Sequence, residues 1–147
     1  MKLNVAWIGK TRQAGIEQLT EEYLKRLARY ADIQGLCLKD EDALLKLCGR
    51  NARSGRHDLA LLDVRGRQFS SEDLARLLEE HRGLSSMPLL FAIGPADGFT
   101  IRARDAALHV LSLGQLTLPH ELARVVLLEQ IYRAFTILKG HPYHLGH

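Results

Sequence analysis

The stretch Asp58-Leu59-Ala60-Leu61-Leu62-Asp63 places four consecutive apolar residues between two aspartates. A strand with one solvent-facing side alternates apolar and polar residues, whereas a strand of a parallel sheet is covered on both faces and is apolar almost throughout. We therefore predict that this stretch is a strand inside a parallel sheet. The segment Pro88-Leu89-Leu90-Phe91-Ala92-Ile93 has the same character and predicts a second strand of this kind.

Segments of helical periodicity separate the apolar stretches. Leu19, Tyr23 and Leu27, for example, recur every four residues, as on one face of a helix. The expected strands are Leu3–Ile8, Ile33–Leu38, Asp58–Asp63, Pro88–Ile93 and His109–Ser112. The expected helices are Ile16–Tyr30, Glu41–Cys48, one that begins at Ser70 or Ser71, Arg102–Leu108, and a long one that Thr117 and Pro119 open and that ends near Leu138. This alternation predicts a single α/β domain with a mainly parallel sheet over residues 1–147.

The composition excludes several protein classes. The 147 residues are 46% apolar, too many for a disordered chain, and no apolar run approaches the roughly 20 residues of a membrane-spanning helix. Residues 1–8 are too short for a signal peptide and lack its cleavage site. Cys37 and Cys48 are too few for a disulfide framework. We therefore expect a reduced, cytoplasmic protein that does not enter a membrane.

The basic residues are unevenly distributed. Lysine and arginine number 20 against 17 acidic residues, a formal net charge of +3. One cluster consists of Arg50, Arg53, Arg56, Arg65 and Arg67, and further basic residues in predicted loops are Lys10, Arg12, Arg102 and Arg104. A basic stripe of this kind suits a nucleic-acid backbone. Charge alone is equally compatible with a solvated surface that binds nothing.

The last predicted helix is apolar around most of its circumference. From Leu122 to Leu138 its charged residues are Arg124, Glu129 and Arg133 alone. A helix on one sheet needs a single apolar stripe, so a wider apolar surface needs a second cover. We predict a homodimer with this helix in the interface; the alternative is a helix covered wholly within its own chain. Glu129 and Arg133, four residues apart, can pair with each other or across that interface.

Two glycine-bearing loops are the candidate ligand site. The P-loop, the dinucleotide-binding fingerprint and the nucleophile elbow are all absent from the sequence. The segments Ile93–Gly98 and Leu111–Pro119 each follow a predicted strand, and ligands of open α/β sheets bind outside the carboxyl ends of strands. Two such loops side by side offer backbone amides and room for a flat ligand such as adenine. Taken alone, each loop can equally be a plain turn.

The histidines at the end of the chain have three interpretations. His141, His144 and His147 are spaced by three, as metal ligands can be, but Pro142 breaks any helix there and no cysteine or carboxylate cluster joins them. We therefore expect no metal. Tyr143 and His144 can instead handle protons, since an unshifted histidine titrates near neutral pH. The remaining interpretation is a frayed tail.

Several segments together resemble one family in one order. They are Leu61–Arg67 with Ser70-Ser71-Glu72, Phe91–Gly98, Leu111–His120, Arg124, Glu129–Ala134 and His141–His144. The chain resembles, over essentially its whole length, the ribosomal RNA large subunit methyltransferase H family. These are pseudouridine-N3 methyltransferases of the SPOUT (α/β-knot) superfamily.

The resemblance implies a fold, a cofactor and a substrate. The parallel sheet would carry a C-terminal trefoil knot, an arrangement that general topology rules disfavour. The protein would be a homodimer whose partner subunit contributes to each site, and its substrate a pseudouridine of 23S ribosomal RNA on the assembled bacterial ribosome. S-adenosyl-L-methionine would lie bent in the knot, held by Leu62, Asp63, Gly94, Pro95, Gly98, Leu111, Ser112, Leu113, Gly114, Gln115, Leu116, Thr117 and Leu118.

The resemblance also implies which residues act on the RNA. Methylation of N3 of a uracil-type ring requires loss of the imide proton, and a positioned base contributes about 10²–10⁴-fold to such a step. By this resemblance Tyr143 and His144 reach the target base. His144 would remove the proton or polarise a ring carbonyl, and Arg133 would hold the RNA or an oxyanion. No metal is required.

Two residues depart from the family pattern. Pro95 stands where the family has a second glycine, so that position lacks a backbone N–H although its carbonyl remains. Leu145 stands where the family has a basic residue, so one phosphate-binding charge is missing. Two other functions share every loop described above: a non-catalytic ribosome-associated module with a relic cofactor pocket, and a knotted methyltransferase that acts on transfer RNA or on unmodified uridine.

Overall fold

The computed structural model describes residues 1–49 and 56–145. Arg50 and Arg53 of the basic cluster, and His147 of the histidine series, lie outside these residues. The strands are β1 (Lys2–Ile8), β2 (Asp32–Leu38), β3 (Asp58–Gln68), β4 (Leu89–Ile93) and β5 (His109–Ser112). The helices are α1 (Ala14–Leu27), α2 (Glu41–Cys48), α3 (Ser71–Leu84), α4 (Ile101–Ala106) and α5 (His120–Leu138).

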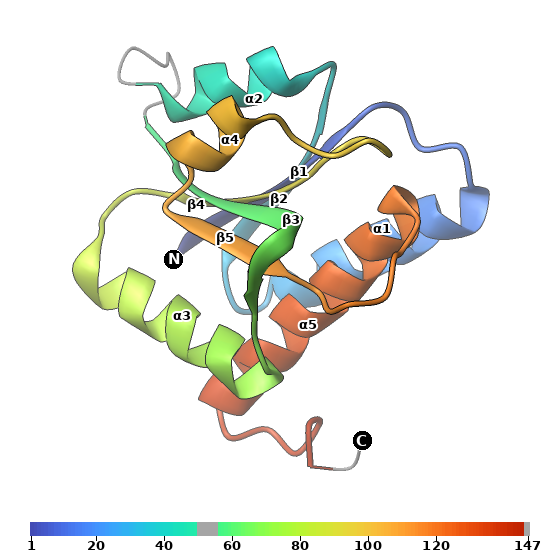
Figure 1. Cartoon of the computed structure of the whole chain (residues 1–147). Coiled ribbons are helices and arrows are strands. Elements are labelled where there is room, and N and C mark those ends of the chain that lie inside the picture. The colour runs from blue at the N-terminus through green and yellow to red at the C-terminus, as the bar shows by residue number, and fades with distance from the viewer. Residues whose placement is uncertain (50–55, 146–147) are drawn as a thin grey trace.

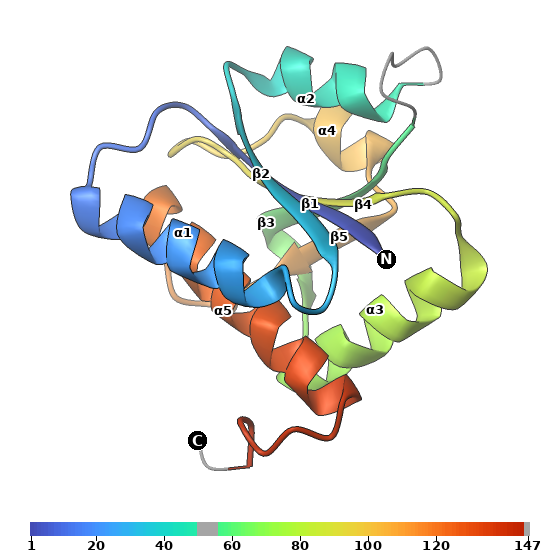
Figure 2. The ribbon, with the colours of Figure 1, turned by 180° about the vertical axis from the view of Figure 1, so that it is seen from behind.

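The strands form one parallel sheet, as the apolar stretches predict. Its order is β2-β1-β4-β3-β5, and each neighbouring pair is parallel. Helices cover both faces: α2 and α4 lie on one side of the sheet and α1, α3 and α5 on the other (Figures 1 and 2). The expected α/β class is therefore confirmed.

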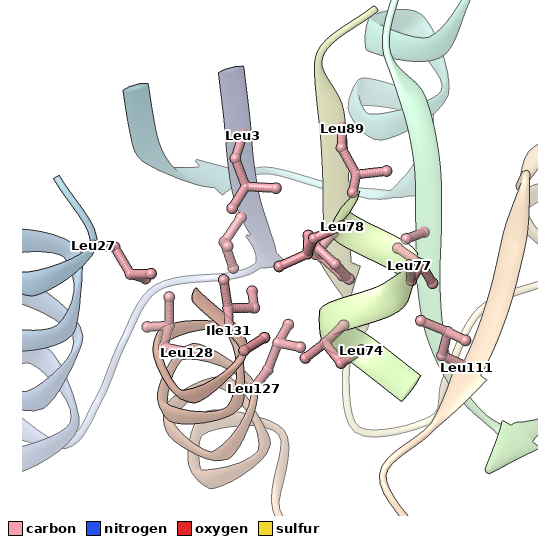
Figure 3. Close-up of a cluster of buried hydrophobic side chains, with 14 of the residues drawn as sticks. Leu3, Leu27, Leu74, Leu77, Leu78, Leu89, Leu111, Leu127, Leu128 and Ile131 are labelled. Carbon is pink, nitrogen blue, oxygen red and sulfur yellow. The ribbon is translucent and has the colours of Figure 1, made fainter. Parts of the chain in front are cut away.

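The central strands are buried on both faces, which explains their continuous apolar runs. Leu89 and Phe91 of β4 point into the core beneath α1, α3 and α5, whereas Leu90 points to the opposite core beneath α2 and α4. Figure 3 shows the larger core, in which side chains from the sheet meet those of α1, α3 and α5. No helix among the described residues combines the length and apolar character needed to cross a membrane.

Strand β3 is longer than the sequence pattern predicts. The expected strand ends at Asp63, but the observed strand continues to Gln68. Leu111 of β5 pairs with Leu62 and again with Arg67, so the register between β3 and β5 shifts between Leu62 and Arg67. The extension was missed because it is rich in charged residues and enters no apolar core.

The chain crosses itself closely where β3 passes β5. A Cβ atom at Gly66 would lie 2.6 Å from the backbone of Leu111, a distance that real side chains essentially never show. Only glycine therefore allows this passage without a shift of backbone. The crossing is consistent with the C-terminal threading that the family resemblance implies.

Helix α5 is covered mainly by its own chain. It packs against α1 and α3 and against the sheet, and Leu127, Leu128 and Ile131 are fully buried. Intrachain cover therefore accounts for much of the apolar circumference that led us to predict a homodimer. An outer face remains, on which Leu122 is 42% exposed and Val126 is partly exposed. The predicted dimer depends on this outer face.

Candidate functional site

A cavity of about 360 Å³ opens where β3, β4 and β5 present their carboxyl ends. Its volume is within the range of about 300–1,000 Å³ typical of small-molecule sites. Three loops and the first turn of α5 form its walls. The lining residues are Leu62, Asp63, Val64, Ile93, Gly94, Pro95, Ala96, Asp97, Gly98, Ser112, Leu113, Gly114, Leu116, Thr117, Leu118, His120 and Ala123.

The structure gathers eleven of the thirteen residues that the resemblance links to the cofactor around this cavity. The other two do not line it. Leu111 is buried in the sheet, where its backbone passes Gly66. Gln115 belongs to the correct loop but is exposed to solvent.

Six lining residues are not among those that the resemblance links to the cofactor: Val64, Ile93, Ala96, Asp97, His120 and Ala123. Ile93, Ala96 and Asp97 belong to the predicted loop Ile93–Gly98, and Val64 directly follows Asp63, so continuity along the chain could have indicated it. His120 and Ala123 are three residues apart in the first turn of α5 and therefore share one face of the helix. Helical periodicity applied to the segment after Pro119 would have found them.

Backbone geometry shapes the loops. Gly114 has φ +131°, a conformation that residues with side chains rarely adopt. The Ser112 hydroxyl accepts a hydrogen bond from the Gly114 N–H (3.2 Å) and donates one to its carbonyl (3.0 Å). In the neighbouring loop the Pro95 carbonyl accepts a hydrogen bond from the Gly98 N–H at 2.9 Å, so it is used to close a tight turn.

Two charged side chains brace the loop between β4 and α4. One guanidinium nitrogen of Arg104 donates to the Phe99 carbonyl at 2.9 Å and lies 3.7 Å from the carboxylate of Asp63. Arg104 therefore connects two walls of the cavity. On the other side Glu41 of α2 accepts a hydrogen bond from the Thr100 N–H at 2.8 Å, which ties the start of α4 to α2.

Glu121 fixes the loop between β1 and α1 beside the cavity. Its carboxylate accepts hydrogen bonds from the backbone N–H groups of Arg12 (2.9 Å) and Gln13 (3.2 Å). These bonds, chiefly that from Gln13, lower the pKa of Glu121. Glu121 follows His120, which lines the cavity, so the backbone of Arg12 is held next to the first turn of α5, and its side chain is exposed.

Arg124 is a buried cation between the same elements. It is 2% exposed, and its guanidinium lies over the Trp7 ring at 4.0 Å from the centroid. It also donates hydrogen bonds to the hydroxyls of Thr11 (2.8 Å) and Thr20 (3.3 Å). Burial lowers the pKa of this guanidinium, which still carries its charge at neutral pH. Trp7, half-buried and packed against the larger core, thus also supports a buried charge.

Arg133, Tyr143 and His144 come together at the far end of α5. Nδ1 of His144 lies 3.1 Å from an Arg133 guanidinium nitrogen, and Arg133 Nε donates to Glu129 Oε1 at 2.8 Å. The Arg133 guanidinium lies 4.9 Å from the centroid of the Tyr143 ring. The edge of Tyr143 meets Tyr132 with 4.9 Å between ring centroids. The tail thus packs against α5 through Tyr143 and His144.

The immediate surroundings of Tyr143 set its protonation. Partial burial raises the pKa of its phenol, so the hydroxyl keeps its proton at neutral pH and can donate a hydrogen bond.

Within residues 1–49 and 56–145, no three metal-binding side chains gather in one place.

The tail cluster and the cavity lie at opposite ends of the same helix. None of Arg133, Tyr143 and His144 lines the cavity. Thirteen residues of α-helix separate His120 from Arg133, a rise of about 20 Å. Figure 1 shows the same separation, with the loop before α5 on one side and the C-terminal tail at the opposite end. One chain therefore does not bring the two groups of candidate residues together.

The cavity entrance carries exposed apolar side chains. Val64 is 76% exposed and Leu116 is 83% exposed, and both line the cavity. The outer face of α5, with Leu122 and Val126, continues from its cavity end toward Glu129 and Arg133. An apolar rim and a helix face that join in this way are typical of a surface that another molecule covers.

Comparisons with known proteins agree with the sequence resemblance. A family model described as predicted SPOUT methyltransferase matches residues 1–144. A ribosomal RNA large subunit methyltransferase H from Koribacter versatilis is 56% identical over 147 residues, covering 100% of both chains. A protein with the same name from Geotalea daltonii is 40% identical, covering 98% of this chain and 99% of its own.

Solved structures share the fold at low sequence identity. A probable methylase family protein from Haemophilus influenzae has a TM-score of 0.58 at 12% identity, covering 96% of this chain and 69% of its own. The SpoU methyltransferase AviRb from Streptomyces viridochromogenes, solved in complex with the cofactor AdoMet, has a TM-score of 0.51 at 14% identity. That match covers 90% of this chain and 57% of AviRb. These two likenesses concern the fold alone.

Proposed function

The chain belongs to the SPOUT methyltransferase family, and from this premise we propose that it methylates N3 of a pseudouridine in 23S ribosomal RNA on the assembled bacterial ribosome. S-adenosyl-L-methionine is the methyl donor. The protein acts in the cytoplasm as a homodimer and needs no metal.

The observation that carries this proposal is the position of the cavity. Its walls are the loops that the family resemblance links to the cofactor, and they meet at the carboxyl ends of neighbouring parallel strands. In open α/β sheets this edge is where ligands bind. The crossing of β3 over β5 behind the cavity supports a knotted cofactor site.

The residues around the cavity suit the cofactor. Leu113, Leu116 and Leu118 provide apolar surface for a flat adenine ring. A Cβ atom at Gly94 would lie 2.9 Å from the Phe99 ring, so glycine at this position lets the cavity loop pack directly against that ring. Asp63, whose side chain is 7% exposed, supplies a carboxylate at the cavity wall that suits the positive charge of the donor. When bound, S-adenosyl-L-methionine supplies an electrophilic methyl group.

A homodimer would complete the site. The tail cluster lies about 20 Å from the cavity along α5, so the Arg133 of one chain does not serve its own cavity. The outer faces of two α5 helices that cross in opposite directions would bring the Arg133 end of one protomer to the cavity end of its partner. Such a pairing would also cover the exposed side chains of Leu122, Val64 and Leu116.

Each residue of the tail cluster has a distinct chemical role in this proposal. His144 takes the N3 imide proton or polarises a ring carbonyl, because a neutral imidazole has one acceptor nitrogen. The Arg133 guanidinium, held by Glu129, binds a phosphate or the oxygen that gains negative charge when the imide loses its proton. Tyr143, protonated at neutral pH, donates a hydrogen bond to the target base.

Exposed basic side chains around the entrance suit a nucleic acid. Arg65 and Arg67 of the β3 extension are exposed beside Val64, and Arg12, whose side chain is exposed, has its backbone held next to the first turn of α5 by Glu121. The net charge of +3 is modest, which fits recognition of a large ribosomal surface better than tight binding to naked RNA.

The decisive experiment supplies radiolabelled S-adenosyl-L-methionine with intact ribosomes, free subunits and stripped RNA, and maps the modified nucleoside. We expect N3-methylpseudouridine in 23S RNA from intact ribosomes. Salt-sensitive ribosome binding without methyl transfer would instead indicate a non-catalytic module. Label in transfer RNA or at an unmodified uridine would indicate the other methyltransferase function.

A complementation experiment tests the shared site. His144→Ala should bind the cofactor but lose turnover, and Gly114→Val should lose cofactor binding because its φ of +131° disfavours a side chain. Coexpressed, the two variants form a heterodimer with one intact cavity and one intact tail, which meet only if the partner supplies the tail. Recovered activity supports the proposal. Unchanged turnover of His144→Ala alone would eliminate His144.

A further inference from the structure

The imidazole of His144 is held at both nitrogens by side chains from two different helices. Nε2 lies 2.8 Å from Oε1 of Glu72 in the first turn of α3, and Nδ1 lies 3.1 Å from a guanidinium nitrogen of Arg133 in α5. The His144 side chain is 28% exposed and that of Glu72 is 56% exposed. The tail is thus held between α3 and α5, which meet at this end of the molecule in Figures 1 and 2.

These two contacts determine which ring nitrogen carries the proton. A carboxylate only accepts hydrogen bonds and a guanidinium only donates them. Nε2 of His144 must therefore be the N–H that donates to Glu72, and Nδ1 must be the acceptor that faces Arg133. A doubly protonated ring would bring a second N–H against the guanidinium of Arg133, so the arrangement suits the neutral imidazole, the form that can act as a base.

The position of Glu72 is set by the capped first turn of α3. Ser70 and Asp73 form the capping box of α3 and satisfy the start of the helix between them. The hydroxyl of Ser71 donates to Oε1 of Gln130 at 2.5 Å, which fixes the first turn of α3 against α5. Glu72, between these residues, faces the tail and contacts His144.

The opposite side of the ring is equally fixed. Glu129, whose side chain is 20% exposed, holds Arg133 through a hydrogen bond of 2.8 Å. Glu129, Arg133, His144 and Glu72 therefore form a continuous series of charged and polar groups from α5 through the tail to α3. The hydrogen bond from His144 is also the largest cause that lowers the pKa of Glu72.

We propose that Glu72 is a positioning residue for methyl transfer, which fixes the tautomer and orientation of His144 through the 2.8 Å contact at Nε2. This inference rests on the proposed function, in which His144 removes the imide proton. In that step the N3–H bond breaks, a bond forms between the proton and Nδ1, and Arg133 turns from Nδ1 to the oxygen that gains charge. The carboxylate of Glu72 then faces the imidazolium and stabilises it.

The first test measures the tautomer of the His144 imidazole directly, without any substrate. Long-range proton–nitrogen NMR of the full-length protein distinguishes the two tautomers of His144. We expect the Nε2–H form in the wild type, a mixture in Glu72→Ala, and retention of the Nε2–H form in Glu72→Gln, whose amide oxygen still accepts. Glu80→Ala removes an exposed carboxylate from the same helix and should leave the ring signal unchanged.

The second test measures turnover of the same variants on ribosomes. Glu72→Ala should lower kcat about tenfold or more, a part of what a positioned base contributes, with an unchanged KM for S-adenosyl-L-methionine. Glu72→Gln, which keeps the geometry but not the charge, should fall between Glu72→Ala and the wild type. Glu80→Ala should turn over like the wild type.

The two tests separate failure of this inference from failure of the proposed function. An Nε2–H signal that persists in Glu72→Ala, or an altered signal with wild-type kcat, would overturn the role of Glu72. If His144→Ala keeps full turnover or the wild type transfers no methyl group, the proposed function fails instead. The ring measurement then still decides whether Glu72 orients His144.

Discussion

The guanidinium of Arg104 lies 3.7 Å from the carboxylate of Asp63 and bonds the Phe99 carbonyl with the same nitrogen. This pairing joins the wall that follows Leu62 to the wall that precedes α4. Side-chain exposure is 21% for Arg104 and 7% for Asp63, so the pair is shielded from water more than a surface ion pair is. The ion pair therefore links two walls of the cavity through side chains that lie outside the glycine-bearing loops Ile93–Gly98 and Leu111–Pro119.

Arg104→Ala should weaken cofactor binding. Its removal leaves the Asp63 carboxylate without a cation and frees the Phe99 carbonyl, so both walls gain freedom that binding must then remove. A charge-assisted hydrogen bond contributes about 1.5–3 kcal/mol, and we expect the dissociation constant for S-adenosyl-L-methionine to rise roughly tenfold by isothermal calorimetry. Arg102→Ala removes a cation of the same helix whose side chain is 72% exposed and should bind normally. Equal affinity of the two variants would contradict the bracing role.

Glu121 should make stability depend on acidic pH. Its folded-state pKa is depressed by the N–H groups of Gln13 and Arg12, so its contribution is complete above the unfolded pKa of about 4.3 and is lost as the pH falls through the folded value. Glu121→Gln should lower the Tm at pH 6 and reduce the difference in Tm between pH 6 and pH 3. Glu21→Gln, on the exposed side of α1, is the control and should keep the wild-type pH profile. A Glu121→Gln profile parallel to the wild type would refute the assignment.

The sheet could be predicted from the sequence because its signals are local. The apolar runs of β3 and β4 predict parallel strands, and Glu41–Cys48 is a helix with the predicted bounds. The extension of β3 to Gln68 was missed because its residues Arg67 and Gln68 pair with Leu111 and Ser112 of β5, a long-range contact with no periodic signature. Leu19 was placed on the packed face of its helix, yet it is 43% exposed.

The candidate site was only partly predictable for the same reason. Loops next to strand ends could be identified from glycine and strand positions, and they do enclose the cavity. The contacts of Arg104 and Glu72 depend on side chains from distant segments that meet only after folding. The family motif includes Glu72, but no local pattern links it to His144, 72 residues away. Contacts between residues so far apart in the sequence depend on how the whole fold brings their segments together.

Val126→Glu should separate the predicted homodimer. Val126 lies on the partly exposed outer face of α5, where a buried unpaired carboxylate would cost several kcal/mol in an interface. Size-exclusion chromatography with light scattering should give a dimer for the wild type and a monomer for Val126→Glu, which should also lose turnover. Leu84→Glu changes an 87% exposed leucine at the end of α3 and should remain dimeric. A dimeric Val126→Glu protein would place the interface elsewhere.

Gly66→Ala should destabilise the fold more than any loop substitution of similar size. The added Cβ would lie 2.6 Å from the backbone of Leu111 and 2.7 Å from that of Val110, and backbone atoms between strands have little room to move. Overpacking of this kind costs about 1–3 kcal/mol and sometimes more. For a domain of this size we expect a fall in Tm of roughly 5–10 °C by calorimetry.

The matched control for Gly66→Ala is Gly83→Ala in α3. A Cβ at Gly83 meets nothing within 4 Å, and alanine favours a helix over glycine by about 1 kcal/mol, so this variant should be at least as stable as the wild type. Because Gly66 lies behind the cavity where β3 crosses β5, Gly66→Ala should also reduce cofactor affinity. A Gly66→Ala protein with wild-type Tm would show that the crossing tolerates a side chain, and the close passage of the two strands would then not account for the glycine.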